Sequence, residues 1–132
     1  MAWIELVSIV ALFQYLMFGV QVGKARTRYG IKGPATAGNE MFERVYRVQM
    51  NTLELLVVFL PALWLAARHI QPVWVSLVGV VFIVGRFVYF RAYTQEPSRR
   101  GLGFMLSIVP TVALLVAALV GLAIEGCRWA NV

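Results

Sequence analysis

The sequence contains almost none of the side chains that bind metals or form disulfide bonds. Its 132 residues include one cysteine, Cys127, and one histidine, His69. A single cysteine cannot form an internal disulfide, and together with one histidine it is too small a set for a metal cluster. We therefore expect no metal site. Any chemistry must come from Arg, Glu, Asn, Gln and Tyr side chains, or from a bound cofactor.

Charged residues are also scarce. They make up 14% of the chain, against 61% hydrophobic residues, and the mean hydropathy is +0.77. A soluble domain is usually about half apolar and about a quarter charged. The net charge is +6, but the basic residues lie between apolar runs and have no soluble face to line. We therefore expect no nucleic-acid partner, and we interpret the basic residues as determinants of membrane topology.

Four apolar stretches are each long enough for a transmembrane helix, which needs about 20 mostly apolar residues. We predict an all-α integral membrane protein, a four-helix bundle that forms a single transmembrane domain over residues 1-132. The spans are expected at about residues 3-26, 40-69, 72-94 and 100-125. Between the first two, residues 30–38 contain three glycines and Pro34, which is turn chemistry. Asn39 is a suitable N-cap for the second helix.

The basic residues also predict the orientation. Ten of the twelve flank the first and third connections, and the positive-inside rule places such connections in the cytoplasm. We therefore expect both termini on the far side of a bacterial inner membrane, or of the endoplasmic reticulum if the source is eukaryotic. These ten residues are Lys24, Arg26, Arg28, Lys32, Arg44, Arg47, Arg86, Arg91, Arg99 and Arg100.

A stripe of polar side chains runs along the predicted second helix. Charged groups at membrane depth cost about 2.5–3.5 kcal/mol on insertion scales, so those that persist usually face protein or a water-filled cavity. At the helical period the stripe covers about 100° of arc, while Gln49 falls on the opposite face. The stripe consists of Glu40, Glu43, Arg44, Arg47, Asn51 and Glu54.

Two interpretations of this stripe are open. Arg47 and Glu54 could form an ion pair between helices that needs no ligand. Alternatively, the stripe could line a polar pocket open to the cytoplasm. The mixture favours the pocket, because guanidinium, amide and carboxylate groups together suit a ligand with carboxylates, an amine and amides. A plain ion pair would not need Asn51.

The predicted third helix carries a second stripe, in which Arg86, Tyr89, Phe90 and Tyr93 share one face. Two phenols beside a guanidinium could support a polar ligand or a reactive anion, or the tyrosines could form an aromatic belt at the membrane interface.

Arg99 and Arg100 precede the fourth helix and could anchor lipid headgroups. They could also place a guanidinium at a helix N-terminus, where the dipole favours an anion such as a thiolate.

Both stripes resemble the signatures of the MAPEG family, the membrane-associated proteins in eicosanoid and glutathione metabolism. The second helix contains Glu43-Arg-x-x-Arg-x-x-x-Asn-x-x-Glu54, and the third contains Arg86-x-x-Tyr-Phe-x-x-Tyr93. The resemblance covers essentially the whole chain and is to the microsomal glutathione S-transferase type. It implies a homotrimer that binds glutathione between adjacent subunits near the cytoplasmic face.

The resemblance also implies a role for individual residues. Within one subunit it assigns the contacts with glutathione to Arg47, Asn51, Glu54, Tyr89 and Tyr93. The adjacent subunit would contribute Arg26 and Gln49, and Arg100 would activate the thiolate with a second hydrogen bond from Tyr93. The role of Gln49 agrees with its position on the opposite helical face.

The implied activity is attack of the glutathione thiolate on a lipophilic electrophile from the bilayer, or reduction of a lipid hydroperoxide. Leu55 and Thr27 differ from the leukotriene-forming members and argue against an eicosanoid substrate.

One alternative is a non-catalytic member that binds membrane lipids or eicosanoids, although such a protein would not need Arg100. A remote alternative is a small multidrug transporter, which needs a carboxylate deep in the first span. Glu5 lies at the start of that span instead.

Overall fold

The computed structural model describes all 132 residues and is entirely helical. Its four long helices are α1 (Ala2–Tyr29), α2 (Glu40–Ala67), α3 (Pro72–Gln95) and α4 (Gly101–Ala130), and one 3-10 turn, η1 (Pro97–Arg99), precedes α4. All four helices are long and apolar enough to cross a membrane. The predicted all-α integral membrane protein with four helices is therefore confirmed.

Local turn chemistry sets most of the helix ends. Gly30 adopts a left-handed conformation with φ 69° at the end of α1, a conformation that glycine accepts at no steric cost. The Asn39 side chain accepts a hydrogen bond from the Phe42 backbone N–H at 3.1 Å, so it is the predicted N-cap of α2. The last helix is longer than predicted. It continues past residue 125 to Ala130, because no proline or turn sequence interrupts it before Asn131.

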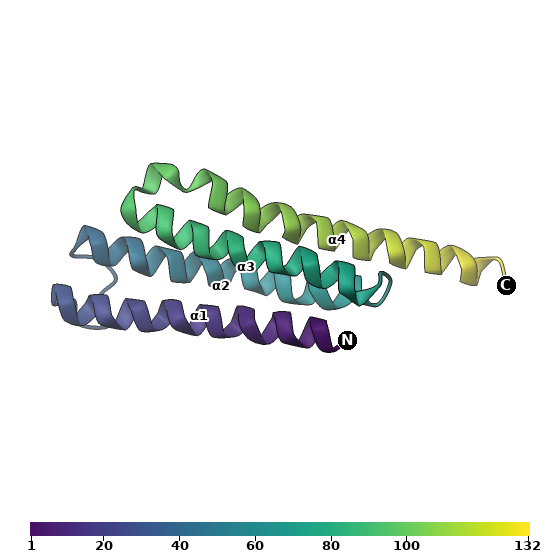
Figure 1. Cartoon of the computed structure of the whole chain (residues 1–132), viewed down its shortest axis with the longest axis horizontal. Coiled ribbons are helices and arrows are strands. Elements are labelled where there is room, and N and C mark those ends of the chain that lie inside the picture. The colour runs from purple at the N-terminus through teal and green to yellow at the C-terminus, as the bar shows by residue number, and fades with distance from the viewer.

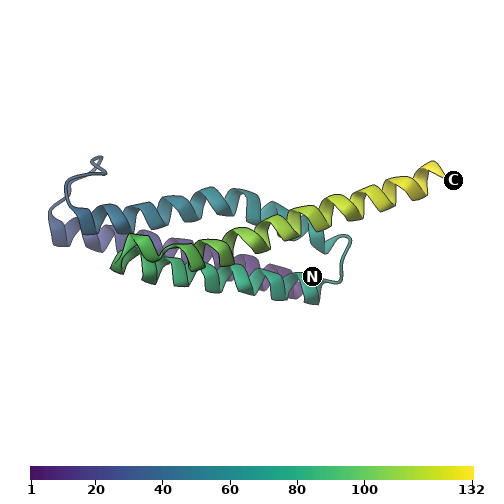
Figure 2. The ribbon, with the colours of Figure 1, turned by 90° about the horizontal axis from the view of Figure 1, so that it is seen from above.

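The helices run side by side, and successive helices are antiparallel (Figure 1). The first and third connections therefore lie at one end of the bundle, and both termini lie at the other. We call the former the basic end, because it carries Lys24, Arg28, Lys32, Arg99 and Arg100. The C-terminal end of α4 projects beyond the other helices (Figure 2).

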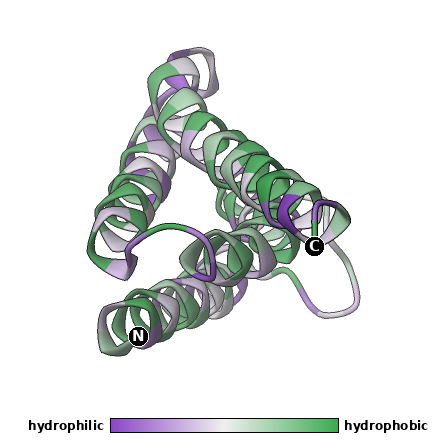
Figure 3. Cartoon of the chain, turned by 90° about the vertical axis from the view of Figure 1, so that its right-hand side faces the viewer, coloured by the Kyte–Doolittle hydropathy of each residue, from purple (hydrophilic) through white to green (hydrophobic).

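The interior and the surface are both apolar. The main core joins all four helices around the rings of Phe59 and Phe82, whose centroids lie 3.8 Å apart. The outer faces of the helices are also hydrophobic (Figure 3). Phe13, Val57 and Leu119, for example, are 64%, 66% and 66% exposed. Such surfaces are incompatible with water over this extent but suit contact with lipid chains.

Two glycines let α3 and α4 approach to backbone contact near the basic end. A Cβ at Gly85 would lie 2.7 Å from the backbone carbon of Leu106, and one at Gly103 would lie 2.4 Å from the Tyr89 nitrogen. Small residues commonly permit such close approach in membrane helix pairs. The contact places the first turns of α4 directly against the tyrosine stripe of α3.

We predict that Gly103→Ala lowers the unfolding free energy by about 1–3 kcal/mol, because the added methyl group forces α4 away from α3. Gly126→Ala on the same helix is the matched control. A Cβ there meets nothing within 4 Å, so this variant should gain up to about 1 kcal/mol of helix propensity. Thermal unfolding in detergent measures both, and equal midpoints for the two variants would contradict the packing argument.

Candidate functional site

A buried arginine lies at the centre of the polar network. Arg86 is 0% exposed. Its Nε donates to Ser107 Oγ on α4 at 2.7 Å, and its Nη1 donates to Asn51 Oδ1 on α2 at 2.7 Å and to Thr52 Oγ1 at 3.4 Å. No carboxylate of the chain pairs with it. The α3 arginine thus joins three helices through neutral acceptors.

The tyrosine stripe of α3 continues from this arginine toward the basic end. The Arg86 guanidinium lies 4.4 Å from the centroid of the Tyr89 ring, and Tyr89 stacks on Tyr93 with centroids 5.4 Å apart. Tyr89 is 4% exposed and Tyr93 is half-buried. Because Tyr89 packs inside the chain, it does not belong to an aromatic belt at the lipid surface.

The polar stripe of α2 divides into two parts. Asn51 is buried and faces Arg86, so it contacts the interior of the bundle. Arg47 and Glu54 face outward and pair with each other along α2 at 3.3 Å, with side chains 51% and 58% exposed. The pair lies within one helix, whereas the ion-pair interpretation placed it between helices. In a single chain both charged groups would face lipid.

Two further predicted residues lie on the α1 side of the bundle. The Gln49 amide packs against Gly19 of α1, where a Cβ would come within 2.8 Å of Nε2. Arg26 donates to the Ala35 carbonyl at 2.7 Å, and its guanidinium lies 4.8 Å from the centre of the Phe42 ring. Gln49 and Arg26 are therefore separated from the Arg86 network, which lies among α2, α3 and α4.

A polar cleft of about 420 Å³ opens at the basic end and brings Arg47 and Tyr93 together. Arg44 donates to the carbonyls of Thr94 and Gln95 at 3.3 and 3.1 Å, and it also pairs with Glu40. These bonds tie the start of α2 to the end of α3. The lining residues are Thr36, Glu40, Glu43, Arg44, Tyr46, Arg47, Tyr93 and Pro97.

Arg100 lies at the N-terminus of α4, at the same end of the bundle as this cleft. Its side chain is exposed and has no ion-pair partner, whereas the neighbouring Arg99 pairs with Glu96 at 3.0 Å. A free guanidinium at a helix N-terminus is suited to attract an anion, because the charge and the helix dipole have the same sign there.

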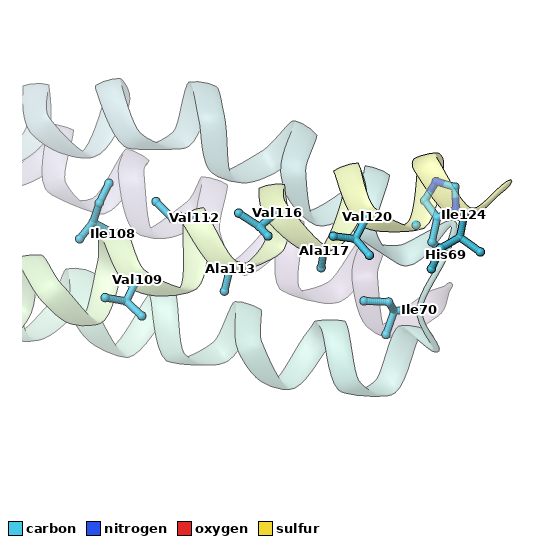
Figure 4. Close-up of a pocket in the computed structure, with 11 residues that line it drawn as sticks. His69, Ile70, Ile108, Val109, Val112, Ala113, Val116, Ala117, Val120 and Ile124 are labelled. Atoms are coloured by element: carbon cyan, nitrogen blue, oxygen red, sulfur yellow. The ribbon is translucent and has the colours of Figure 1, made fainter. Parts of the chain in front are cut away.

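A larger hollow than this cleft lies elsewhere and is apolar. It has a volume of about 830 Å³ and follows α4 from Ile108 to Ile124, with His69 at its end (Figure 4). Nine of its eleven lining residues are hydrophobic, so this groove offers no set of polar groups for chemistry. The candidate site for a polar ligand is therefore the smaller cleft with the adjoining face of α2.

Comparison with known proteins identifies the family. Residues 4–120 match the MAPEG family over most of the chain. The chain belongs to the MAPEG family. The family predicted from the two stripes is thus confirmed.

Individual MAPEG relatives align over most of their length. Microsomal glutathione S-transferase 2 of Homo sapiens is 38% identical over 117 residues, which are 89% of this chain and 80% of that protein. An uncharacterized protein of Synechocystis sp. is 43% identical over 120 residues, which are 91% of this chain and 88% of that protein. Leukotriene C4 synthase of Cavia porcellus is 31% identical over 121 residues, which are 92% of this chain and 81% of that protein. None of these similarities supports the multidrug-transporter alternative.

The MAPEG signature alone did not reveal the two hydroxyl groups that hold Arg86. Ser107 and Thr52 are both 0% exposed. Each donates its own proton to a carbonyl one turn earlier, at 2.7 and 2.8 Å, which leaves the oxygen free to accept from the arginine. A hydroxyl residue inside an apolar span is the sequence signal that could have indicated these contacts.

We expect Arg44→Ala to loosen the end of α3, because the Thr94 and Gln95 carbonyls lose their charged donor. The backbone amides of residues 95, 96 and 98–100 should exchange with solvent about tenfold faster. Hydrogen exchange read by mass spectrometry measures this. Arg91→Ala, which removes an exposed arginine with no ion-pair partner on the same helix, should leave the rates unchanged. Equal exchange in both variants would argue against this role of Arg44.

Proposed function

We propose that this protein is a membrane-bound glutathione S-transferase that binds glutathione between the subunits of a homotrimer and activates its thiolate. The observation that carries the proposal is the Arg47–Glu54 pair, which faces outward from a helix apolar enough to span a membrane, with Arg47 lining a polar cleft. Charged groups in that position are costly against lipid. A neighbouring subunit and a polar ligand would cover them together.

The covering surface can come from another copy of the same chain. Gln49 and Arg26 lie on the α1 side, and Arg47 and Glu54 lie on the outward face of α2. A contact that joins two different faces is heterologous and closes into a ring when the rotation permits it. A trimer follows from the family resemblance. In such a ring each site would contain Gln49 and Arg26 from one subunit and Glu54 from the next.

The groups of glutathione match this set of side chains. Glutathione carries two carboxylates, an ammonium group, two amides and a thiol. Arg47 is suited to a carboxylate through paired N–H donors, and Glu54 is suited to the ammonium group. Asn51, Tyr89 and Gln49 supply hydrogen bonds for the remaining carboxylate and amide groups. Each of these side chains except Tyr89 belongs to α2.

The proposed chemistry is nucleophilic substitution or addition by sulfur. A free thiol is a weak nucleophile, whereas its anion is reactive. Arg100 would favour the thiolate by charge and hydrogen bonding, and the Tyr93 hydroxyl would donate a second bond. The thiol proton passes to solvent at the basic end. The sulfur then forms a C–S bond with the electrophile, and any leaving group departs with its electron pair.

The electrophile would reach the site from the bilayer. Most of the outer surface of the four helices is apolar, so a lipophilic molecule dissolved in the membrane can approach the site through it without crossing a polar barrier. Glutathione, which is charged, would enter from water at the basic end. By the positive-inside rule this end faces the cytoplasm, where we place the active site.

Purified protein in detergent should conjugate glutathione to 1-chloro-2,4-dinitrobenzene. We expect Arg100→Ala to lower kcat about 10²-fold, a typical cost of removing a donor to a developing anion, while glutathione binding stays nearly intact. Arg99→Ala is the matched control and should retain activity, since Arg99 already pairs with Glu96. An unchanged thiolate absorbance in Arg100→Ala would rule out the assigned role. Glutathione binding without any conjugation would favour the non-catalytic alternative.

The shared site predicts complementation between two inactive variants. Gln49→Ala and Glu54→Ala each damage every site in a uniform trimer. Co-expression of the two should restore part of the activity, because a mixed trimer contains interfaces at which both contributing faces are intact. Each variant expressed alone is the control. If the whole site lay within one chain, co-expression would restore nothing.

A further inference from the structure

We propose that Arg86 is a positioning residue that fixes Asn51 as a hydrogen-bond donor toward an oxygen acceptor of glutathione. The inference rests on the proposed function and assigns a role to a residue that cannot itself touch the ligand, since Arg86 is 0% exposed. It also specifies which edge of the Asn51 amide the ligand meets.

The orientation of Asn51 follows from the chemistry of its partner. An asparagine side chain has one oxygen that accepts and one nitrogen that donates, whereas a guanidinium has donors alone. Arg86 Nη1 lies 2.7 Å from Asn51 Oδ1. Rotating the amide by half a turn would bring an N–H group against another N–H group. Asn51 is therefore held with its oxygen toward the bundle and its nitrogen away from Arg86.

Arg86 is itself held in place from two helices. Ser107 donates its hydroxyl proton to the Gly103 carbonyl at 2.7 Å, and Thr52 donates to the Val48 carbonyl at 2.8 Å. Neither hydroxyl has a second proton, so each can only accept from Arg86. The guanidinium also lies against the Tyr89 ring. Its Nε and Nη1 are thus directed toward fixed acceptors on α4 and α2.

The Asn51 nitrogen is available to a ligand. None of the chain's hydrogen bonds uses Nδ2, and this atom is not among the fully buried polar atoms that lack a partner. Asn51 lies between Arg47 and Glu54 along α2, one turn from each, and these two face outward. The free donor is therefore on the flank of the proposed glutathione site.

The charge of Arg86 specifies the kind of acceptor. No carboxylate of the chain offsets this buried cation, and Nη2 has no hydrogen-bond partner. A positive potential in a poorly polarisable interior acts over a longer distance than it does in water. Beside it, an anionic oxygen is favoured over the ammonium group. The geometry thus assigns a carboxylate of glutathione to Asn51.

A double-mutant cycle on the full-length protein in detergent tests the positioning role, with glutathione binding measured by calorimetry. Asn51→Ala and Arg86→Met should each weaken binding about tenfold, the usual scale for a hydrogen bond with a charged partner. Because Arg86 acts mainly through Asn51, Arg86→Met should cause a much smaller further loss in the Asn51→Ala background, where only the field of Arg86 on the ligand is still lost. Losses that multiply to about a hundredfold would overturn the inference.

A second pair of variants covers the case in which Arg86→Met does not fold. Ser107→Ala removes an acceptor of Arg86, whereas Thr111→Val removes a buried hydroxyl whose single bond is to the Ser107 carbonyl at 2.8 Å. Ser107→Ala should weaken glutathione binding about threefold to tenfold, and Thr111→Val should leave it unchanged. Equal affinities for the two variants would also overturn the inference.

Asn51→Asp separates positioning from stability. The aspartate keeps an acceptor for Arg86 and adds a counter-ion, so the thermal midpoint should be retained or raised. It removes the donor to the ligand, so glutathione binding should fall at least about tenfold. Binding that survives this change would contradict the donor role. If the unsubstituted protein binds no glutathione, the proposed function fails as well. If it binds glutathione normally but the losses from Asn51→Ala and Arg86→Met multiply in the double variant, only this inference fails.

Discussion

The requirement to satisfy one buried cation organises the half of the bundle near the basic end. Arg86 is fully enclosed by α2, α3 and α4 and reaches oxygen acceptors on both neighbouring helices. An unpaired polar group in such a place is costly, so the acceptors must come close. Gly103 permits this, because α4 can approach the α3 backbone only where no side chain intervenes. The close approach of α3 and α4 and the hydrogen bond from Arg86 to Ser107 therefore depend on the same contact.

The same constraint divides the second helix into three faces with different roles. Asn51 faces the arginine, Gln49 packs against α1, and Arg47 faces outward with Glu54. Two of these faces pack against other helices of the chain. The third face carries exposed charges, which are costly against lipid. A ligand and a second subunit that covered this face would therefore stabilise the structure most.

The sequence predicted the fold well where local chemistry decides it. Gly30 and Asn39 have backbone preferences of their own, so both ends of the first loop could be predicted without knowing which helices pack nearby. The polar stripe was predicted as one surface, but it is divided in the structure. A helical wheel gives the angle of Asn51 relative to Arg47 but not which neighbour covers that edge. Ser107 remained unrecognised because a single serine in an apolar run has no periodic signal.

Charge balance connects the buried network with the proposed chemistry. Arg47 is offset by Glu54, whereas Arg26, Arg86 and Arg100 have no carboxylate partner in the chain. At neutral pH glutathione carries two carboxylates and one ammonium group, so its thiol form offsets one of these three cations and its thiolate form offsets two. Ionisation of the thiol therefore reduces the uncompensated positive charge of the site. Arg86 would contribute to this at a distance, through its field, while Arg100 would act at the sulfur.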